Sequence, residues 1–176
     1  MRKLKITGIC LLMCTLAVLL RNACKKDDDE GTATIHVQLK DAPGDYQQVN
    51  VEVVDVELHT SSGGWQNIAV TDSIYDLILL QDSANVVLGT STFSTATISQ
   101  VRLILGQNNS VVVGGVSFPL QLSSQDETGL KLNVHQELLP NAIYTLVLDF
   151  DAAQSVIDEG NGNYRLKPVL KAEFSL

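Results

Sequence analysis

Residues 32–40 read TATIHVQLK, and this stretch indicates the class of fold. Its apolar side chains stand on alternate positions, at Ala33, Ile35, Val37 and Leu39. Alternation with a period of two is the pattern of a β-strand that buries one face. The residues that follow, DAPGD at 41–45, contain a proline and a glycine that favour a reverse turn. The predicted domain therefore begins with a half-buried strand and a turn.

The second strand shows the same alternation with one interruption. Its apolar positions are first odd-numbered and then even-numbered, at Val49, Val51, Val53, Val54, Val56 and Leu58. A slip of one residue turns every later side chain to the opposite face. A β-bulge at Val53 and Val54 would return these side chains to the core, and we predict one there. The SSGG loop at 61–64 then predicts a hairpin into a strand at 65–70.

The rest of the chain is a series of short strands separated by glycine, asparagine and proline. One short helix is predicted near residues 151–159, because Asp151 is a suitable N-cap with Gln154 at N3. Gly160 would close this helix. Pro168 cannot donate to a ladder, so its strand lies at an edge or carries a bulge. Further strands are predicted at residues 73–80, 86–88, 100–105, 110–113, 116–122, 130–134, 143–150 and 164–174.

These strands predict a single all-β domain over residues 32–176. About nine or ten short strands at this spacing are typical of a two-sheet β-sandwich of immunoglobulin-like or transthyretin-like type. A closed barrel is the alternative arrangement.

The first 23 residues have the features of a lipoprotein signal peptide. Arg2, Lys3 and Lys5 precede a mostly apolar stretch at 6–20, which is shorter than the roughly 20 residues of a transmembrane helix. The small Ala23 directly before Cys24 resembles a lipobox, which implies lipid attachment to Cys24 and cleavage before it. Arg21 departs from the aliphatic residue usual in that pattern, so an uncleaved signal anchor is the alternative.

An acidic run follows the cysteine at once. Like charges repel and favour an extended chain, so residues 24–31 are predicted to form a tether. The run resembles the export signal of Bacteroidota lipoproteins, which implies an outer-membrane lipid anchor and display on the cell surface. The residues concerned are Lys25, Lys26, Asp27, Asp28, Asp29 and Glu30.

Cysteine positions and charge limit the classes of function. The three cysteines stand at positions 10, 14 and 24, so the predicted domain contains no disulfide. From Cys24 onward eight basic residues face twenty acidic ones, which gives a net charge near −12. Such a charge repels phosphate backbones, and we expect no nucleic-acid partner.

No motif in the chain indicates catalysis. His36, His59 and His135 lie far apart and lack the spacing of metal ligands. No cysteine follows Cys24, and no GxSxG turn occurs. We therefore expect no enzyme activity and no cofactor; a Ser/His/Asp site assembled from distant strands is the alternative.

Four aspartates form a candidate calcium site. Asp41 and Asp45 lie in one loop, and strand alternation puts Asp149 and Asp151 on one side of the chain. Calcium uses oxygen ligands of this kind. The competing interpretation, which we prefer, is structural: Asp41 begins a turn, Asp151 caps the helix, and Asp149 pairs with a base such as Lys131. We therefore expect no metal.

Aromatic and hydroxyl side chains supply two further candidate sites. Trp65 and Tyr46 lie in or beside loops and are candidates for a small sugar-binding platform. The competing interpretation places Trp65 in the core. The tripeptides at 72–74 and 82–84 resemble the O-glycosylation sites of Bacteroidota envelope proteins, which implies modification at Ser73 and Ser83.

Six short stretches follow one another in a recognisable order. They are DAP at 41–43, YDL at 75–77, VRLIL at 101–105, GLKL at 129–132, LDFDA at 148–152 and YRLKPV at 164–169. In this order they resemble the domain of unknown function 4382 (DUF4382) family, which is common in Bacteroidota lipoproteins. The resemblance covers roughly residues 32 to 172 and implies a β-sandwich in the cell envelope; it assigns no reaction, ligand or site.

The sequence therefore predicts an exported lipoprotein whose sandwich is a non-catalytic binding or structural module. Its membrane contact is the lipid on Cys24, and its ligand is a glycan, a peptide or an envelope partner. A fimbria-like or envelope-assembly component is the alternative, and an enzyme is a further one. The oligomeric state stays open.

Overall fold

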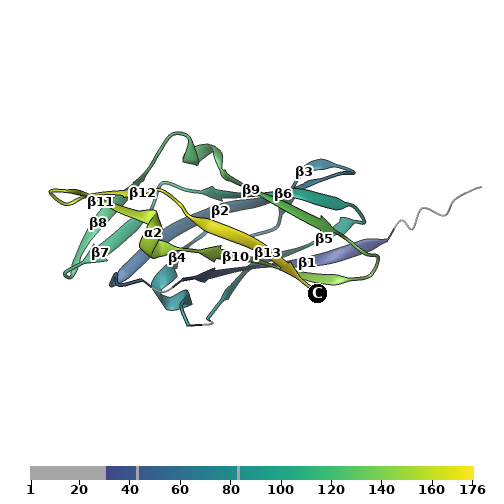
Figure 1. Ribbon diagram of the computed structural model, residues 1–176, viewed down its shortest axis with the longest axis horizontal. Helices are drawn as coiled ribbons and strands as arrows, with labels where there is room; N and C mark the ends of the chain where they lie inside the picture. Colours follow the sequence, from purple (N-terminus) through teal and green to yellow (C-terminus); the bar gives the residue numbers. More distant parts are fainter. Residues whose placement is uncertain (1–30, 43, 83) are drawn as a thin grey trace, which may run out of the picture. The chain divides into compact units, whose positions relative to one another are not determined.

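The computed structural model describes residues 31–42, 44–82 and 84–176. Within it Gly31–Leu176 is one compact unit, built mostly from strands in two sheets (Figure 1). In the described part of the chain, no helix has the length and apolar character needed to cross a membrane. The elements are β1 (Thr32–Asp41), β2 (Gln48–Thr60), β3 (Gly64–Ile68), β4 (Ser73–Asp76), η2 (Leu77–Leu80), β5 (Val86–Ser94), β6 (Thr97–Leu105), β7 (Ser110–Val113), β8 (Val116–Leu122), η3 (Asp126–Thr128), β9 (Leu130–Glu137), β10 (Ile143–Phe150), α2 (Ala152–Ser155), β11 (Val156–Gly160), β12 (Asn163–Leu166) and β13 (Leu170–Ser175).

The smaller sheet has the strand order β13-β10-β1-β5. Its central pair, β1 and β10, is parallel, with Thr34 opposite Ile143 and Asp41 opposite Phe150. A parallel pair needs a long crossover, and here almost the whole of the other sheet lies between the two strands in sequence. The ends of β1 and β10 therefore meet at one corner of the molecule.

The larger sheet is organised around the long strand β2. One edge of β2 pairs with β6 and β7, and the other edge pairs with β3 and β4. The full path is β11-β12-β8-β7-β2-β6-β9. Strand β3 is thus joined through β2 and β6 to β9, and these four strands form one continuous surface (Figure 1).

The predicted bulge in β2 is confirmed. The register with β6 shifts between Val53 and Asp55. Val53 and Val56 are fully buried, whereas Val54 is 39% exposed. The bulge therefore returns the second half of β2 to the core, as the sequence required.

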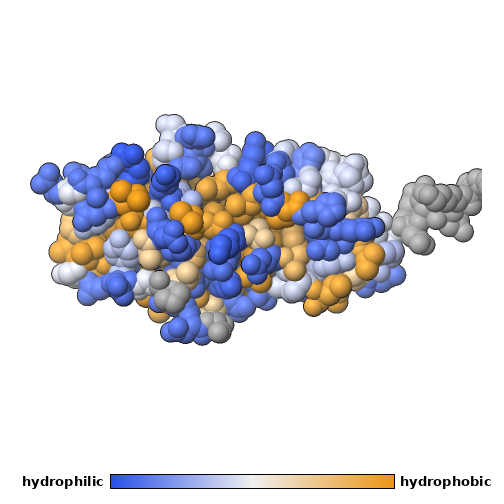
Figure 2. Space-filling model, viewed as in Figure 1, coloured by the Kyte–Doolittle hydropathy of each residue, from blue (hydrophilic) through white to orange (hydrophobic). Residues whose placement is uncertain are grey.

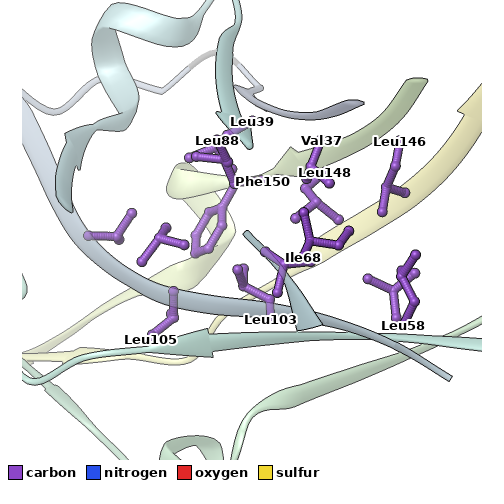
Figure 3. Close-up of a cluster of buried hydrophobic side chains, with 14 of the residues drawn as sticks. Val37, Leu39, Leu58, Ile68, Leu88, Leu103, Leu105, Leu146, Leu148 and Phe150 are labelled. Atoms are coloured by element: carbon purple, nitrogen blue, oxygen red, sulfur yellow. The ribbon is translucent and has the colours of Figure 1, made fainter. Parts of the chain in front are cut away.

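The core lies between the two sheets, and both contribute to it (Figure 3). Val37, Leu146, Leu148 and Phe150 come from the smaller sheet and have no exposed surface. The larger sheet contributes Leu58, Ile68, Leu103 and Leu105 in the same view. Two facing sheets with a shared apolar core confirm the predicted all-β sandwich and exclude the closed barrel.

The strands predicted at 86–88 and 130–134 extend to Ser94 and Glu137, and three other predicted elements differ in kind or in sheet. The helix ends at Ser155 rather than near residue 159, because Val156 pairs with Leu166 and begins β11. The segment 73–80 is a strand only to Asp76, whose side chain accepts a hydrogen bond from Ile78 N and starts a 3₁₀ turn. Residues 164–174 form two strands in different sheets, interrupted around Pro168.

The surface is mixed in character. The face in Figure 2 shows hydrophobic patches among hydrophilic side chains. Leu79 and Ile143 are examples of exposed apolar residues, 74% and 59% exposed, and they belong to different elements. Single exposed apolar residues of this kind are normal for a folded domain.

Candidate functional site

Trp65 lies on the outer face of the larger sheet. It stands opposite His59 in the β2–β3 hairpin, three residues before Ile68, which is buried. Side chains alternate along a strand, so a buried Ile68 turns Trp65 away from the core. The expectation that Trp65 fills the core is therefore wrong.

Trp65 belongs to a row of side chains that crosses four strands. Strand pairing places Trp65 beside His59, His59 beside Gln100, and Gln100 beside Asn133. A second row, one pair further along, contains Asn67, Glu57, Arg102 and Lys131. We call these eight residues the Trp65 face; across four strands it is about 14 Å wide.

The indole ring of Trp65 is surrounded by cationic and aromatic groups. The guanidinium carbon of Arg102 lies 3.9 Å from the ring centroid, and Lys131 Nζ lies 5.9 Å from it. The His59 ring approaches edge-on, with 5.1 Å between centroids. Cations within about 6 Å of an indole centroid are attracted by its π-electrons, so these contacts hold the ring flat against Arg102.

Arg102 is in turn fixed from two sides. Its Nη1 donates to Glu57 Oε2 at 2.5 Å, and the two side chains are only 19% and 15% exposed. A Cβ atom at Gly129 would lie 2.8 Å from Arg102 Cγ and Cδ, so only glycine lets the η3 segment approach this closely. Arg102 therefore supports the indole ring on a rigid base.

A serine and a histidine meet at the border of this face. His59 Nδ1 and Ser99 Oγ are 3.0 Å apart. A serine-nucleophile triad also needs a carboxylate that orients the imidazole. Among the residues with described side chains, no carboxylate makes a hydrogen bond or ion pair with His59. The pair thus has two of the three groups of a triad.

Tyr46 lies at the other end of β2. It precedes Gln48, the first residue of this strand, whereas Trp65 stands opposite His59 near its last residue. Eleven residues of strand separate the two ends by about 36 Å. Tyr46 packs against the core, and burial raises the pKa of its hydroxyl. The predicted platform made of Trp65 and Tyr46 together is therefore wrong.

The predicted calcium ligands gather in part at the corner where β1 and β10 end. Asp41 is buried; its Oδ1 accepts from Ala152 N at 2.8 Å and its Oδ2 from Gln81 Nε2 at 3.2 Å. Burial raises the pKa of Asp41 to about 6, and the charges of Asp151 and Asp149 act in the same direction. We call Asp41, Asp149, Asp151 and Gln81 the Asp41 corner.

The other two carboxylates of this corner also have partners. Asp149 Oδ2 accepts from Lys40 Nζ at 3.0 Å, which replaces the predicted partner Lys131, because parallel pairing sets Lys40 opposite Asp149. Asp151 Oδ1 accepts from Gln154 N at 2.9 Å, so the predicted N-cap is confirmed. Asp149 and Asp151 line a depression of about 200 Å³.

Asp45 is exposed and does not line that depression. Over the described ranges, no three His, Cys, Asp or Glu side chains are placed to hold a metal ion. The absence of a metal stays an expectation, and of the four candidate ligands only Asp149 and Asp151 line the same depression.

Two neighbouring depressions flank η3, and the sequence analysis did not find them. One, of about 410 Å³, is lined by Ser123, Gln125, Asp126, Arg165 and Lys167. The other, of about 310 Å³, is lined by Gln125, Asp126, Thr128, Gly129, Leu130 and Lys131. Both share Gln125 and Asp126, and the second reaches Lys131 of the Trp65 face. The sequence held one signal for these depressions. Only six basic residues occur in residues 31–176, and three of them line the two depressions.

Several predicted sites lie elsewhere. Ser73 begins β4 and is partly buried opposite Val53. Ser83, Cys24 and the run from Lys25 to Glu30 lie outside the described residues.

Comparison with known families shows which family the chain matches. A family model described as "Domain of unknown function (DUF4382)" matches residues 32–168. Searches of curated proteins and of solved structures return no significant match.

Proposed function

Since this chain belongs to the DUF4382 family, whose description names no activity, we propose a function from its geometry: a non-catalytic glycan-binding module on an exported lipoprotein. The supporting observation is Trp65, a partly exposed indole that lies on the outer face of a sheet and is held there by Arg102. An indole offers a large rigid apolar surface with one polar edge, which suits the apolar face of a sugar ring.

Polar groups for sugar hydroxyls stand in the same row. Gln100 Nε2 donates to Asn133 Oδ1 at 2.9 Å, which fixes both amides. Each amide has an oxygen acceptor and two N–H donors. Gln100 Oε1 can therefore still accept, and the Asn133 amide nitrogen can still donate, a hydrogen bond to a sugar hydroxyl. Ligand sites combine an apolar surface with a few oriented polar groups of this kind.

The binding experiment uses the full chain in mild detergent and an array of neutral and acidic glycans. Trp65→Ala should weaken the best ligand by about three- to tenfold, the range for loss of one aromatic contact. Trp65→Phe should retain part of the affinity. His36→Ala is the control, because it removes another outward-facing ring, which contacts Thr90 Oγ1 on the smaller sheet, away from Trp65. No binding to any glycan, or equal binding by Trp65→Ala, would refute the proposal.

The membrane anchor is tested separately through Cys24. One acyl chain binds a bilayer only marginally, whereas the two or three chains of a lipoprotein cysteine hold it firmly. Cys24→Ala should abolish labelling by an alkyne fatty acid. Unchanged labelling would move the lipid to Cys10 or Cys14 and contradict the anchor.

Display on the cell surface is tested through the acidic run. Neutral replacements of Asp27, Asp28, Asp29 and Glu30 should reduce cleavage by external protease in intact cells, at constant total lipoprotein. If external protease cleaves the variant as readily as the wild type, the acidic run acts only as a tether and not as an export signal.

A further inference from the structure

Basic side chains are rare in this chain after Gly31, and they are unevenly placed. Residues 31–176 contain six lysines and arginines against sixteen aspartates and glutamates. Four of the six, Arg102, Lys131, Arg165 and Lys167, lie around η3. The remaining two, Lys40 and Lys171, lie at or beside the Asp41 corner.

The four cations around η3 differ in whether a carboxylate neutralises them. Arg102 pairs with Glu57, and Arg165 pairs with Glu159. Lys131 and Lys167 are exposed and form no ion pair with any residue whose side chain the structure describes. An exposed ammonium without a carboxylate is free to bind an anion as a point charge.

These two lysines lie along one hollow surface. Lys167 lines the larger depression, Lys131 lines the smaller one, and the shared residues Gln125 and Asp126 connect them. Lys131 Nζ is also 5.9 Å from the centroid of the Trp65 ring. The order along the surface is therefore Lys167, η3, Lys131 and Trp65. We call it the η3 groove.

The helical turn η3 contributes the opposing charge. The Asp126 carboxylate accepts a hydrogen bond from Ser123 Oγ at 2.6 Å, and Glu127 is exposed. Asp126 is partly buried and lines both depressions, so it weakens the attraction of an anion to the two lysines, whereas the charges of more distant acids are screened over about 8 Å at physiological salt. An anion at either lysine is thus bound locally while the protein as a whole stays acidic.

We propose that the η3 groove binds an acidic polysaccharide, with anionic sugar substituents at Lys131 and Lys167 and one sugar ring on Trp65. This inference rests on the proposed glycan-binding function and narrows it to one substrate class. A neutral sugar would use the indole and the amides only. An acidic chain would use both lysines as well, and it matches the only two cations at this surface that the described structure leaves without a carboxylate.

The test measures binding of the full chain to three probes: polygalacturonate, dextran sulfate and neutral dextran. Polygalacturonate carries carboxylates and dextran sulfate carries sulfates, so the two distinguish the source of the anion. Both Lys131→Gln and Lys167→Gln should weaken the acidic probes by about two- to fivefold, as for an exposed ion pair. The double variant should lose about tenfold.

Two further variants are controls. One removes a lysine at a different site, and the other removes a negative charge from the η3 groove. Lys171→Gln removes a lysine that also lacks an ion pair among the described side chains but lines the depression at the Asp41 corner; it should change nothing. Asp126→Asn removes the opposing charge and should strengthen binding of acidic probes.

The outcomes separate this inference from the function on which it rests. Binding of neutral and acidic glycans alike, lost in Trp65→Ala but kept in the lysine variants, would overturn the acidic class and leave glycan binding intact. Absence of binding to every glycan would overturn both. Equal lysine-dependent binding of duplex DNA or anionic vesicles would also overturn the inference, because the groove would then select charge and not a sugar.

Discussion

The Asp41 corner and the Trp65 face both place charged side chains on neighbouring strands. The two regions differ in whether those charges have partners inside the protein. At the Asp41 corner a buried carboxylate accepts from Ala152 N and Gln81, and Asp149 pairs with Lys40. At the Trp65 face Arg102 is paired with Glu57, whereas Lys131 forms no ion pair with any described side chain and lies near the indole. Polar groups whose hydrogen bonds and ion pairs are all formed within the protein stabilise the fold. Polar groups at the surface that can still form such interactions are available to a ligand.

The largest effect is expected from Asp41→Ala. The change leaves the buried Ala152 N–H without its acceptor and removes one of the two acceptors of the partly buried Gln81 amide, which keeps Gly44 O. Loss of a buried acceptor destabilises a fold by about 1–3 kcal/mol, which urea unfolding measures. Asp45→Ala is the matched control, an exposed aspartate of the same loop, and should change the unfolding free energy by less than about 0.5 kcal/mol. If both variants lose the same unfolding free energy, Asp41 has no special structural role.

Asp41 should also make stability depend on pH. Its folded pKa, about 6, lies above the ordinary value of 3.8, so the folded state holds the proton more tightly than the unfolded chain. The contribution of this group is therefore full below about pH 4 and is lost as pH rises to about 6. The unfolding free energy of the wild type, measured relative to Asp41→Asn, should fall across this window. A flat or rising difference would contradict the buried state of the carboxyl.

A smaller loss is expected from Asp151→Ala. This change removes the cap that accepts from Gln154 N but leaves the Asp41 contact to Ala152. Loss of an N-cap costs about 0.5–2 kcal/mol. Asp151→Asn keeps an acceptor and should restore most of the unfolding free energy in the same urea experiment. If Asp151→Asn is as unstable as Asp151→Ala, the charge and not the cap is what matters.

The smallest effect on stability is expected at the Trp65 face. Trp65→Ala removes the stacking on Arg102, which contributes about 0.5–1 kcal/mol at an exposed site. No buried partner loses its hydrogen bond, since Arg102 keeps Glu57. The melting temperature should therefore fall less than in Asp41→Ala. A larger fall would make Trp65 a structural residue and weaken the contrast between the two regions.

Local patterns were sufficient to predict the sandwich and the bulge in β2. The shift from Val53 to Val54 lies within one strand, and alternation reads it directly. The Asp151 cap could be found for the same reason, because its partner Gln154 is three residues away. The helix was predicted too long because pairing of Val156 with Leu166 overrides a local signal.

Long-range pairing explains what the sequence did not predict. Lys40 meets Asp149 only because β1 and β10 are parallel, and no short-range pattern contains that register. In the same way, Arg102 lies under Trp65 only because β3, β2 and β6 are in register. The outer position of Trp65 could have been predicted from the sequence. Ile68 is the more apolar candidate for the core, and side chains three residues apart in a strand lie on opposite faces.

The central claim is that Trp65 binds a glycan and contributes only about 0.5–1 kcal/mol to the stability of the fold, and a thermal shift experiment tests both parts at once. Wild type, Trp65→Ala and Asp151→Ala are melted with and without the best-binding glycan of the array at about a hundred times its Kd, where a native-state ligand adds about 2.7 kcal/mol. The account predicts a clear rise for wild type and for Asp151→Ala, which melts lower without ligand but responds equally. For Trp65→Ala it predicts a smaller rise, equivalent to about 1.4–2.1 kcal/mol for a three- to tenfold weaker Kd, from a starting stability lowered by about 0.5–1 kcal/mol. Equal rises in all three proteins, or no rise in the wild type, would contradict the claim.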